Sequence, residues 1–365
     1  MKLKTVYIDD AVAKSREAIS IAARINVPVE IVPNADEVFR RVSQSSDPAG
    51  AGKEILWLTR NKGPFLKDCP GTKTYICCDY EILHVGSYCN MDCAYCILQS
   101  YFHPPVLTYF VNHDDMGRQL KTRFAQNRIG RIGTGEFTDS MIWEKWCDLS
   151  SKLVPVFADQ KKTVLELKTK TVNIDSLENL GHNRKTILAW SLNTEAVIDG
   201  QERRTTSLAA RLKAAARCVS WGYPVAFHFD PLIIYPGCEE DYKQVLDSLF
   251  ETIDPAQIVW ISLGALRFMP ELKNIIADRF PDSKIPYGEF ITGLDNKMRY
   301  FKPLRIELFK MMVTRIKALA PEVLTYLCME DGEAWQKVFG FVPEDQGGLG
   351  RMLDKSAILH CDLEN

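Results

Sequence analysis

Short apolar runs alternate with helical stretches between about residues 75 and 266, and this alternation restricts the possible folds more than any other feature. Repeated strand and helix units predict a parallel sheet, because parallel strands need a long crossover connection between them. In one connection Ser207 is a predicted helix N-cap, and Gly222 is predicted to end that helix. In folds of this kind the chemistry is expected at the carboxyl ends of the strands. The six predicted strands are Ile82–Gly86, Arg131–Thr134, Val164–Leu167, Ile187–Ser191, Val225–Phe229 and Ile258–Leu263.

The composition is that of an ordinary globular protein and excludes an overall polycation. Of the 365 residues, 46% are hydrophobic and 25% are charged, and the formal net charge is −2. The first residues lack the apolar core of a signal peptide, and no run approaches the ~18 apolar residues of a membrane-spanning helix. We therefore expect a cytoplasmic protein that has no contact with a membrane.

The chain has eleven cysteines, many for a reducing compartment in which disulfides are rare. Cys89, Cys93 and Cys96 are separated by three and two residues, and no fourth cysteine follows closely. Thiolates are soft ligands that suit zinc or iron–sulfur centres. A structural zinc site needs four ligands, and the nearest histidines, His84 and His103, do not form a second pair. The loop therefore predicts a [4Fe–4S] cluster with one open iron, with structural zinc or incidental clustering as the alternatives.

This cysteine spacing resembles the radical S-adenosylmethionine (SAM) superfamily. The resemblance implies an α/β fold with a partial parallel (βα)6 barrel, a [4Fe–4S] cluster on the three cysteines, and SAM bound at the strand ends. Gly133-Thr-Gly135-Glu136, directly after the second predicted strand, looks like the superfamily turn that holds the SAM amino group. Glycines let the backbone approach a ligand, and a carboxylate accepts hydrogen bonds from an ammonium group. The alternative is a tight loop without a ligand.

Polar residues also end the later predicted strands. Lys170 ends the third strand, and Ser191 and Asn193 end the fourth, where they are candidates for contacts with the SAM ribose and carboxylate. The alternatives are a surface lysine and a helix-capping pair. His228 and Asp230 end the fifth strand, and His228 is equally well interpreted as a core histidine.

Several separate motifs together resemble the spore photoproduct lyase family over about residues 75 to 310. The resemblance implies that a reduced cluster splits SAM and that the 5′-deoxyadenosyl radical abstracts hydrogen from a thymine dimer in DNA. Tyr95 matches a family tyrosine near the radical path and is the candidate catalytic residue. The implied partners are lesion-containing DNA and an electron donor such as flavodoxin or ferredoxin. The motifs are Cys-x3-Cys-x-Tyr-Cys-x-Leu-Gln, Tyr109-x-Val-Asn112, Thr169-Lys170, Ser191-x-Asn193, Gly222-Tyr223-Pro224 and Glu239-Glu240-x-Tyr242.

Two positions depart from that family. Phe137 stands where the family has the cysteine that returns a hydrogen atom to the product, and a phenyl ring cannot donate that hydrogen. Ile97 stands where the family has a tyrosine after its third cluster cysteine. Cys147 is expected to be a buried structural thiol, although a helix that turned it inward would make it a substitute donor.

A second cysteine group precedes the cluster loop. Adjacent cysteines in an extended segment point to opposite faces and cannot easily bind one metal. We therefore expect core packing under the cluster loop, with an auxiliary metal centre as the alternative. The group consists of Cys69, Cys77 and Cys78.

A basic segment runs from Lys297 to Lys317, with a single acid, Glu307, and several aromatic residues. Basic side chains can follow phosphates while aromatic rings stack on exposed bases. The alternative, which is compatible with the first, is an amphipathic helix that packs on the barrel. The candidate nucleic-acid contacts are Arg267, Arg299, Lys302 and Arg305.

Three regions are expected: an N-terminal α/β subdomain over residues 1–74, the partial barrel over 75–290, and a mainly helical C-terminal region over 291–365. The first functional hypothesis is a radical SAM enzyme that repairs a DNA lesion such as a thymine dimer. The alternatives are a radical SAM enzyme with a non-DNA substrate and a non-catalytic iron–sulfur protein that binds nucleic acid.

Overall fold

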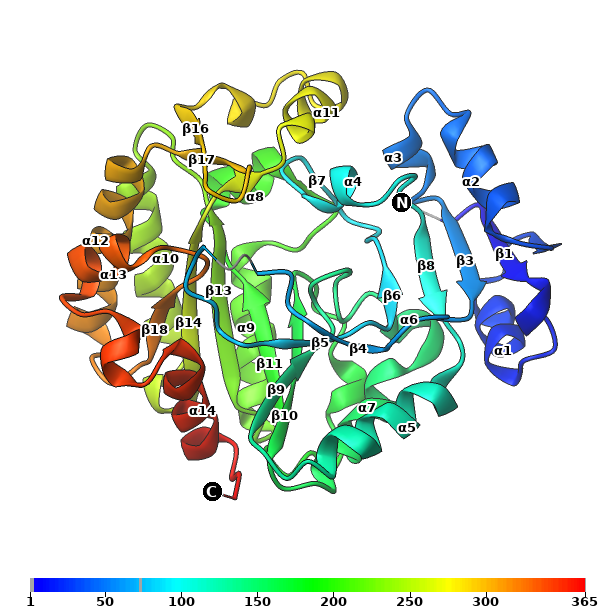
Figure 1. Cartoon of the computed structure of the whole chain (residues 1–365), viewed down its shortest axis with the longest axis horizontal. Helices are drawn as coiled ribbons and strands as arrows, with labels where there is room; N and C mark the ends of the chain where they lie inside the picture. Colours follow the sequence, from blue (N-terminus) through cyan, green and yellow to red (C-terminus); the bar gives the residue numbers. More distant parts are fainter. Residues whose placement is uncertain (1–2, 72–73, 365) are drawn as a thin grey trace.

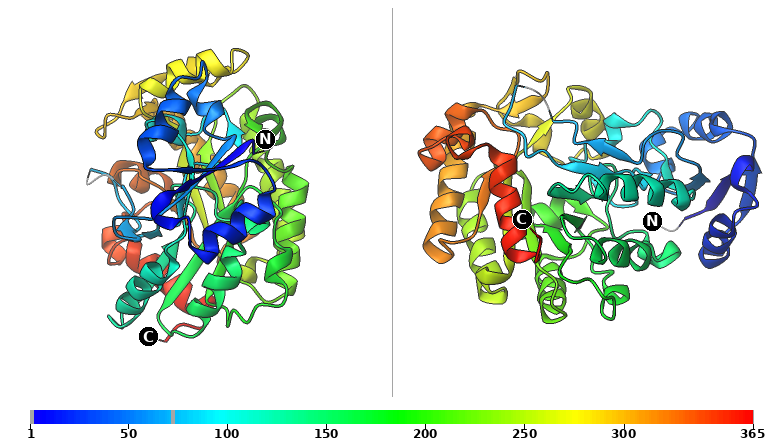
Figure 2. Two further views of the ribbon diagram at one scale, coloured as in Figure 1. Left: turned by 90° about the vertical axis from the view of Figure 1, so that its right-hand side faces the viewer. Right: turned by 60° about the horizontal axis from the view of Figure 1, so that its bottom comes forward.

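A computed structural model describes residues 3–71 and 74–364 (Figure 1). Two main sheets lie beside each other, a large curled one and a smaller one at the N-terminal end of the chain (Figures 1 and 2). The cysteine loop lies between them, above the large sheet in the view of Figure 1. In the described residues no helix has both the length and the apolar character needed to cross a bilayer.

The large sheet has eight strands in the order β18-β14-β13-β11-β10-β9-β5-β4. Neighbours are parallel from β18 to β5, and only β4 runs antiparallel to its neighbour. The α/β class and the partial parallel barrel are confirmed, with one short strand added at each edge. The strands are β4 (Leu66–Asp68), β5 (Glu81–Leu83), β9 (Gly130–Gly133), β10 (Thr163–Thr169), β11 (Thr186–Ser191), β13 (Val225–Leu232), β14 (Ile258–Ala265) and β18 (Thr325–Leu327).

The strands of the barrel have continuous apolar runs because both of their faces are covered. Every residue of β11 and β14 is buried. Helices α9 and α7 pack on the outer face, α9 against β11 and β13 and α7 against β10 and β11. The predicted cap of α9 is confirmed, since the Ser207 hydroxyl accepts the Ala210 N–H at 3.3 Å. The outer helices are α7 (Leu149–Ala158), α9 (Leu208–Ser220), α10 (Cys238–Thr252) and α12 (Lys302–Leu319).

The C-terminal helix α14 (Leu349–His360) covers the open side of the barrel. It packs against β14 near one edge of the sheet. It also reaches β9, because Arg131 pairs with Asp354 at 2.7 Å and donates to the Gly350 carbonyl at 3.3 Å. The last helix of the chain therefore helps to enclose the interior of the barrel.

The smaller sheet has the order β2-β1-β3-β8-β6. Its first three strands lie in the expected N-terminal subdomain, whereas β8 and β6 come from beyond residue 74. Backbone pairing of β3 with β8 therefore joins the N-terminal region to the segment that carries the cysteine loop. Its elements are β1 (Thr5–Asp9), α1 (Arg16–Ile25), β2 (Val29–Val32), α2 (Ala35–Ser43), α3 (Pro48–Ala51), β3 (Ile55–Thr59), β6 (Gly86–Ser87) and β8 (Leu107–Phe110).

A small three-stranded sheet, β15-β17-β16, lies at the same end of the molecule as the cysteine loop (Figure 1). Helix α12 follows it and packs on α10 and α13, and α11 packs on α4. These elements are α4 (Leu98–Tyr101), α11 (Glu271–Arg279), α13 (Gly332–Phe339), β15 (Arg267–Phe268), β16 (Phe290–Thr292) and β17 (Met298–Tyr300). The remaining elements are α5 (His113–Phe124), α6 (Glu144–Cys147), α8 (Glu195–Gln201), β7 (Asp92–Cys93) and β12 (Glu202–Arg203).

Candidate functional site

The cysteine loop is held between two other parts of the chain. Its strand β7 pairs antiparallel with β12, so that Cys93 lies opposite Glu202. Cys89 and Cys93 are buried, and Cys96 is partly exposed. The Gln99 amide donates to the carbonyls of Cys93 and Ala94 at 3.2 and 3.1 Å, which braces the turn between the second and third cysteines.

The three thiols of the loop are a donor set of the kind that iron–sulfur clusters use. All eleven cysteines are unpaired. In the part of the chain that the structure describes, no three His, Cys, Asp or Glu side chains are grouped to hold one metal ion. In a cubane each thiolate binds its own iron, so the sulfur atoms stand apart. Three free thiols on one braced loop therefore fit a [4Fe–4S] cluster with an open iron.

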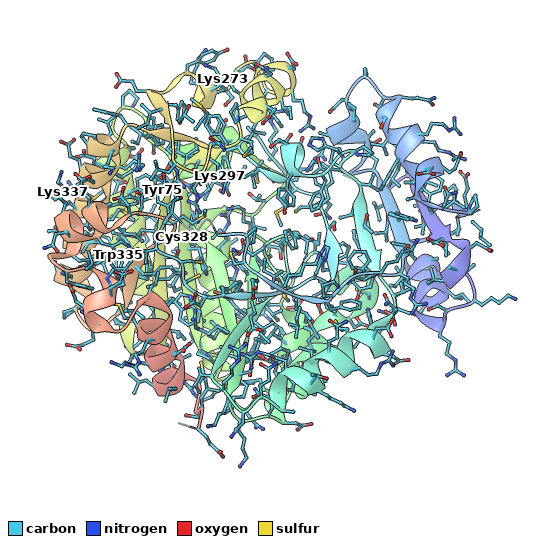
Figure 3. All side chains as sticks on the ribbon, in the orientation of Figure 1. Tyr75, Lys273, Lys297, Cys328, Trp335 and Lys337 are labelled. Carbon is cyan, nitrogen blue, oxygen red and sulfur yellow. The ribbon has the colours of Figure 1, made fainter. Side chains whose placement is uncertain are left out.

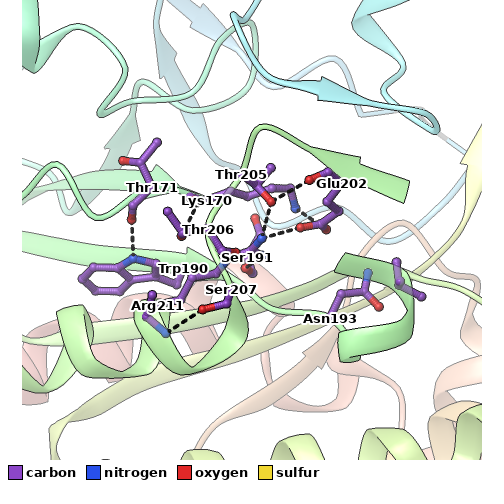
Figure 4. Close-up of polar contacts among 12 residues, drawn as sticks. Lys170, Thr171, Trp190, Ser191, Asn193, Glu202, Thr205, Thr206, Ser207 and Arg211 are labelled. Atoms are coloured by element: carbon purple, nitrogen blue, oxygen red, sulfur yellow. Dashed lines mark hydrogen bonds and ion pairs between the residues drawn. The ribbon is translucent and has the colours of Figure 1, made fainter. Parts of the chain in front are cut away.

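Tyr95, inside this loop, belongs to a buried charge network, of which Figure 4 labels Lys170, Glu202 and Arg211. Its hydroxyl donates to Glu202, which also pairs with Arg211 at 2.5 Å and with Lys170 at 3.3 Å. Burial alone would raise the pKa of Glu202, but Lys170 and Arg211 overcome this effect and lower the pKa to about 2. Burial and the charge of Glu202 raise the pKa of Tyr95, so the ring stays a neutral phenol. The network fixes the loop tyrosine beside the predicted cofactor residue Lys170.

Ser191 and Asn193 are placed at the end of β11, but the contacts recorded for them are structural. The Ser191 carbonyl accepts from Arg211 at 2.8 Å. The Asn193 amide donates to the Pro231 carbonyl at 2.9 Å, and its oxygen accepts from the Tyr242 hydroxyl at 2.8 Å. Asn193 therefore ties the ends of β11 and β13 together, and its contact with SAM stays a prediction.

The predicted glycine turn follows β9 and is packed tightly. A Cβ at position 133 would lie 1.6 Å from the Tyr80 hydroxyl, and a Cβ at position 135 would lie 2.8 Å from the Lys168 Cβ. Gly133 and Gly135 are therefore required by packing, whatever they bind. Glu136 pairs with Lys168, and both side chains remain partly exposed.

A cavity of about 90 Å³ lies inside the barrel, next to this turn. Within it, His228 Nε2 lies 2.7 Å from Glu166, and Arg267 pairs with Asp230 at 3.0 Å. The core interpretation of His228 is thus the one that its contacts support. The Tyr80 hydroxyl also lines the cavity and makes no hydrogen bond among the described residues. The charged lining consists of Arg131, Glu136, Glu166, Lys168, His228, Asp230 and Arg267.

Four thiols line the same cavity, and they come from three separate segments. Cys69 follows β4, Cys77 and Cys78 precede β5, and Cys328, which Figure 3 labels, follows β18. The expected packing of the first three against the core is only part of their environment, because they also face this space. Cys147, in contrast, is buried in α6 and donates to the Trp143 carbonyl at 3.3 Å, as a structural thiol would.

Phe137 is not among the described residues that line this cavity. Its ring stacks on Tyr101 with centroids 5.8 Å apart and meets the His84 ring edge at 4.8 Å. The cluster of Phe137, Tyr80 and Ile82 is packed against Cys69 and Cys78. Position 137 is therefore an aromatic packing position with two of the cavity thiols beside it.

Each of the four candidate nucleic-acid residues has an acidic partner. Arg267 pairs with Asp230, as described above, and Lys302 pairs with Asp331 and Glu333 at 2.7 and 2.8 Å. Both side chains are partly exposed.

The other two candidates are interior. Arg305 pairs with Glu330 at 2.9 Å. Arg299 pairs with Asp295 at 2.7 Å and lies 4.0 Å over the Tyr75 ring, which Figure 3 labels. Arg299 and Arg305 are buried, so contact with a phosphate would require these pairs to break. Their contact with nucleic acid stays a prediction that the geometry does not favour.

Several residues of the site escaped the sequence analysis. Lys53 and Arg279 contact the cysteine loop from distant segments, and Glu202 joins Tyr95 to Lys170. Asp139 accepts from the Lys170 and Met141 backbone N–H groups, each at 2.9 Å. Of these residues, only Asp139 could have been found from the local sequence, because it is an acidic residue three positions after Glu136 in a polar turn.

The family model for spore photoproduct lyase matches residues 75–301, more than half of the chain. The chain belongs to the spore photoproduct lyase family. The matched segment carries the cysteine loop, the barrel strands from β5 to β14 and the β15-β17-β16 sheet. The resemblance seen in the separate motifs is thereby confirmed.

Two curated spore photoproduct lyases show how far the similarity extends. The one from Clostridium acetobutylicum is 26% identical over 225 residues, which is 60% of this chain and 64% of the relative. The one from Bacillus subtilis is 26% identical over 208 residues, 55% of this chain and 60% of the relative. The match thus spans somewhat less than two thirds of these family members.

Solved structures of the family share the fold. A cysteine-to-alanine variant of spore photoproduct lyase with dinucleoside spore photoproduct superposes with a TM-score of 0.79 at 20% identity, covering 89% of this chain and 98% of the other. A double variant with bound S-adenosylmethionine and the same dinucleoside gives 0.77 at 19% identity, with the same coverage. The fold of the spore photoproduct lyases therefore extends beyond the residues that the family model matches.

Proposed function

We propose that the protein is a radical SAM enzyme that acts on a thymine-dimer lesion in DNA, as a carbon–carbon lyase of the spore photoproduct lyase type. The observation that carries the proposal is the braced loop of three free thiols at the carboxyl end of a parallel barrel. Family membership supports it, as do relatives solved with S-adenosylmethionine and dinucleoside spore photoproduct.

In this proposal Cys89, Cys93 and Cys96 hold a [4Fe–4S] cluster and leave one iron for SAM. When bound and reduced, the cluster supplies the electron that splits SAM into methionine and a 5′-deoxyadenosyl radical. The protein contributes placement and the exclusion of water. Cys89 and Cys93 are buried, which keeps these two thiols away from solvent.

The remaining site residues would orient SAM. Glu136 is partly exposed and paired with Lys168, and its carboxylate can accept from the amino group of SAM. Lys170, held by Glu202, offers its ammonium group to the carboxylate of SAM. The backbone around SAM would be shaped by Gly133, Gly135, Ser191 and Asn193. Tyr95 stays neutral and hydrogen-bonded, so it is the candidate aromatic group beside the reaction.

The proposed partners are lesion-containing DNA and a one-electron donor such as flavodoxin or ferredoxin, in the cytoplasm. Eleven unpaired cysteines suit a reducing compartment. Lys302 and Arg267 are the partly exposed candidates for DNA phosphates. Lys302→Ala should weaken DNA binding for every sequence and reduce the salt slope by about one ion.

The test is anaerobic reconstitution with iron and sulfide, reduction, and addition of SAM with DNA that carries a defined dithymine lesion. We expect 5′-deoxyadenosine together with restored thymines. Cys93→Ala should lose the cluster and both products, whereas Cys147→Ala, which removes a buried thiol elsewhere, should keep them. Cluster-loaded protein that forms no 5′-deoxyadenosine would overturn the proposal and favour a non-catalytic iron–sulfur protein that binds nucleic acid.

A second candidate function keeps the radical chemistry but changes the substrate. It is favoured by the aromatic packing of Phe137 and by the acidic partners of the four candidate DNA contacts. This candidate predicts 5′-deoxyadenosine without thymine release. Deuterium placed in the lesion would then fail to appear in 5′-deoxyadenosine.

A further inference from the structure

Lys53 is a fully buried cation that comes from outside the matched family segment. It follows α3, in the N-terminal region, and its side chain has 0% exposure. The backbone beside it is fixed, because the Gly52 carbonyl accepts from Leu107 at 3.0 Å and a Cβ at position 52 would lie 1.7 Å from the Pro105 carbonyl oxygen. Lys53 is therefore presented to the barrel by a rigid turn.

The Lys53 ammonium is wrapped by the first half of the cysteine loop. It donates to the Cys89 carbonyl at 3.0 Å and to the Met91 carbonyl, and it lies 3.8 Å from the Asp92 carboxylate. It also lies 4.3 Å from the centre of the Tyr88 ring. One ammonium group thus contacts or faces four residues of the segment 88–92.

Arg279 contacts the same loop and lies beside the same carboxylate oxygen of Asp92 as Lys53 does. Its guanidinium pairs with Asp92 at 3.1 Å and with Asp47 at 2.8 Å, and it donates to Gln99. Asp47 and Gln99 lie before and after the loop, so Arg279 joins the N-terminal region, the loop and α11. Of Lys53 and Arg279, only Lys53 donates to the carbonyl of a predicted ligand.

Burying an ammonium group only to hold two carbonyl groups is energetically unfavourable, because its desolvation costs several kcal/mol. What a charge adds beyond a neutral donor is stabilisation of nearby negative charge. A [4Fe–4S] cluster on three thiolates is anionic and gains a further negative charge on reduction, and its potential responds to net charge and hydrogen bonds. Lys53 places a positive charge beside the loop, and its hydrogen bonds to the Cys89 and Met91 carbonyls fix the backbone of the first predicted ligand.

We propose that Lys53 is a positioning residue that fixes the segment from Cys89 to Asp92 and raises the reduction potential of the cluster. This inference rests on the proposed function, since it needs the cluster. It assigns a role to the N-terminal region in electron uptake. Asp92 should act in the opposite direction, because its carboxylate disfavours the reduced state.

The test is a redox titration of cluster-loaded protein, followed by the electron paramagnetic resonance signal of the reduced cluster. Lys53→Met keeps the length of the side chain and removes its charge. We expect the ratio of reduced to oxidised cluster to fall about tenfold at a fixed applied potential, a shift of about 59 mV to more negative values for one electron. Lys53→Arg should stay near the wild-type potential, and Asp92→Asn should shift it to more positive values.

Lys185→Met is the matched control. Lys185 is also buried and also donates to main-chain carbonyls, those of Cys361 at 3.0 Å and Asp362 at 2.6 Å, but it contacts the C-terminal end of the chain instead of the loop. Its substitution should leave the potential of the cluster unchanged.

The outcomes separate this inference from the proposed function. An unchanged potential in Lys53→Met would overturn the inference alone. If Lys53→Met does not fold, an unchanged potential in Asp92→Asn would do the same. Shifted potentials without SAM cleavage would support the inference and overturn the proposed function. Wild-type protein that takes up no iron and sulfide would overturn both.

Discussion

Glu166 shows how the barrel keeps charge inside a closed space. Its carboxylate is buried, accepts a hydrogen bond from Trp260 at 3.4 Å, and lies 2.7 Å from His228. Burial would raise the pKa of Glu166, but the charge and the hydrogen bond of His228 outweigh it and lower the pKa to about 2. The pair of Glu166 and His228 therefore stabilises the folded state at neutral pH, and this stabilisation is lost in acid.

This pKa predicts acid sensitivity of folding. A carboxyl group whose pKa is lower in the folded state contributes stability above its unfolded pKa, near 4.3, and loses it as the pH falls through about 2. Between pH 5 and pH 2 the wild-type free energy of unfolding should fall by about 3 kcal/mol more than that of Glu166→Gln. Urea unfolding at a series of pH values measures this difference.

His228→Asn is the companion variant for that experiment. It leaves the Glu166 carboxyl buried but removes the side chain whose Nε2 lies 2.7 Å from it. The pKa of Glu166 should then rise, so the acid-dependent loss of stability should shrink. Equal pH slopes for the wild type and Glu166→Gln would contradict the assignment.

At the scale of elements, α12 shows why the basic segment looked like a free surface. The predicted amphipathic helix is present, with Ile306, Leu308 and Phe309 buried. Cations of the basic segment have partners just outside it: Arg299 in β17 pairs with Asp295, and Lys302 and Arg305 in α12 pair with acids in the stretch from Glu330 to Glu333. A local charge excess in sequence is thus cancelled by residues that the fold brings beside it.

The first turn of α12 therefore carries one buried ion pair, Arg305 with Glu330, and one partly exposed ion pair, Lys302 with Asp331 and Glu333. Arg305→Ala should lower the free energy of unfolding by about 3–5 kcal/mol, because it leaves Glu330 buried without its partner. Lys302→Ala should lower it by about 1 kcal/mol or less, since the partly exposed pair is screened by water. Urea unfolding at neutral pH compares the two. Similar small effects from both would show that Arg305 is not anchored as described.

The predictable elements were those with a strong local pattern. Strands such as β13 and β14 are continuous apolar runs that only a doubly covered parallel sheet accommodates, and the Ser207 cap is a local signal. Strands β7 and β12 have two residues each and no pattern of their own.

The cysteines could be found because their spacing is itself the signal. Lys53 and Glu202 could not, because their roles depend on partners 36 and 107 residues away.

At the scale of the whole molecule, the N-terminal region and the barrel share one site. The smaller sheet is completed by β8, on the far side of the cysteine loop, and Lys53 reaches that loop from the preceding turn. Helix α14 closes the barrel from the other end of the chain. The interior is thus assembled from both termini, and the four cavity thiols are brought together only by the complete fold.

Those thiols predict where the hydrogen returned to the product originates if the proposed reaction takes place. Burial raises the pKa of Cys69 to about 12 and also raises that of Cys328, so both keep an S–H bond at neutral pH. In the transfer that bond breaks, a C–H bond forms on the product, and the remaining sulfur radical takes hydrogen from 5′-deoxyadenosine.

Because S–H groups exchange with water, thymine formed in heavy water should carry deuterium. Alanine at Cys69 or Cys328 should reduce this labelling at least severalfold, whereas Cys361→Ala, a buried thiol under α14, should not. Unlabelled thymine from the wild type, or full labelling in both cavity variants, would place the donor outside this pair of thiols.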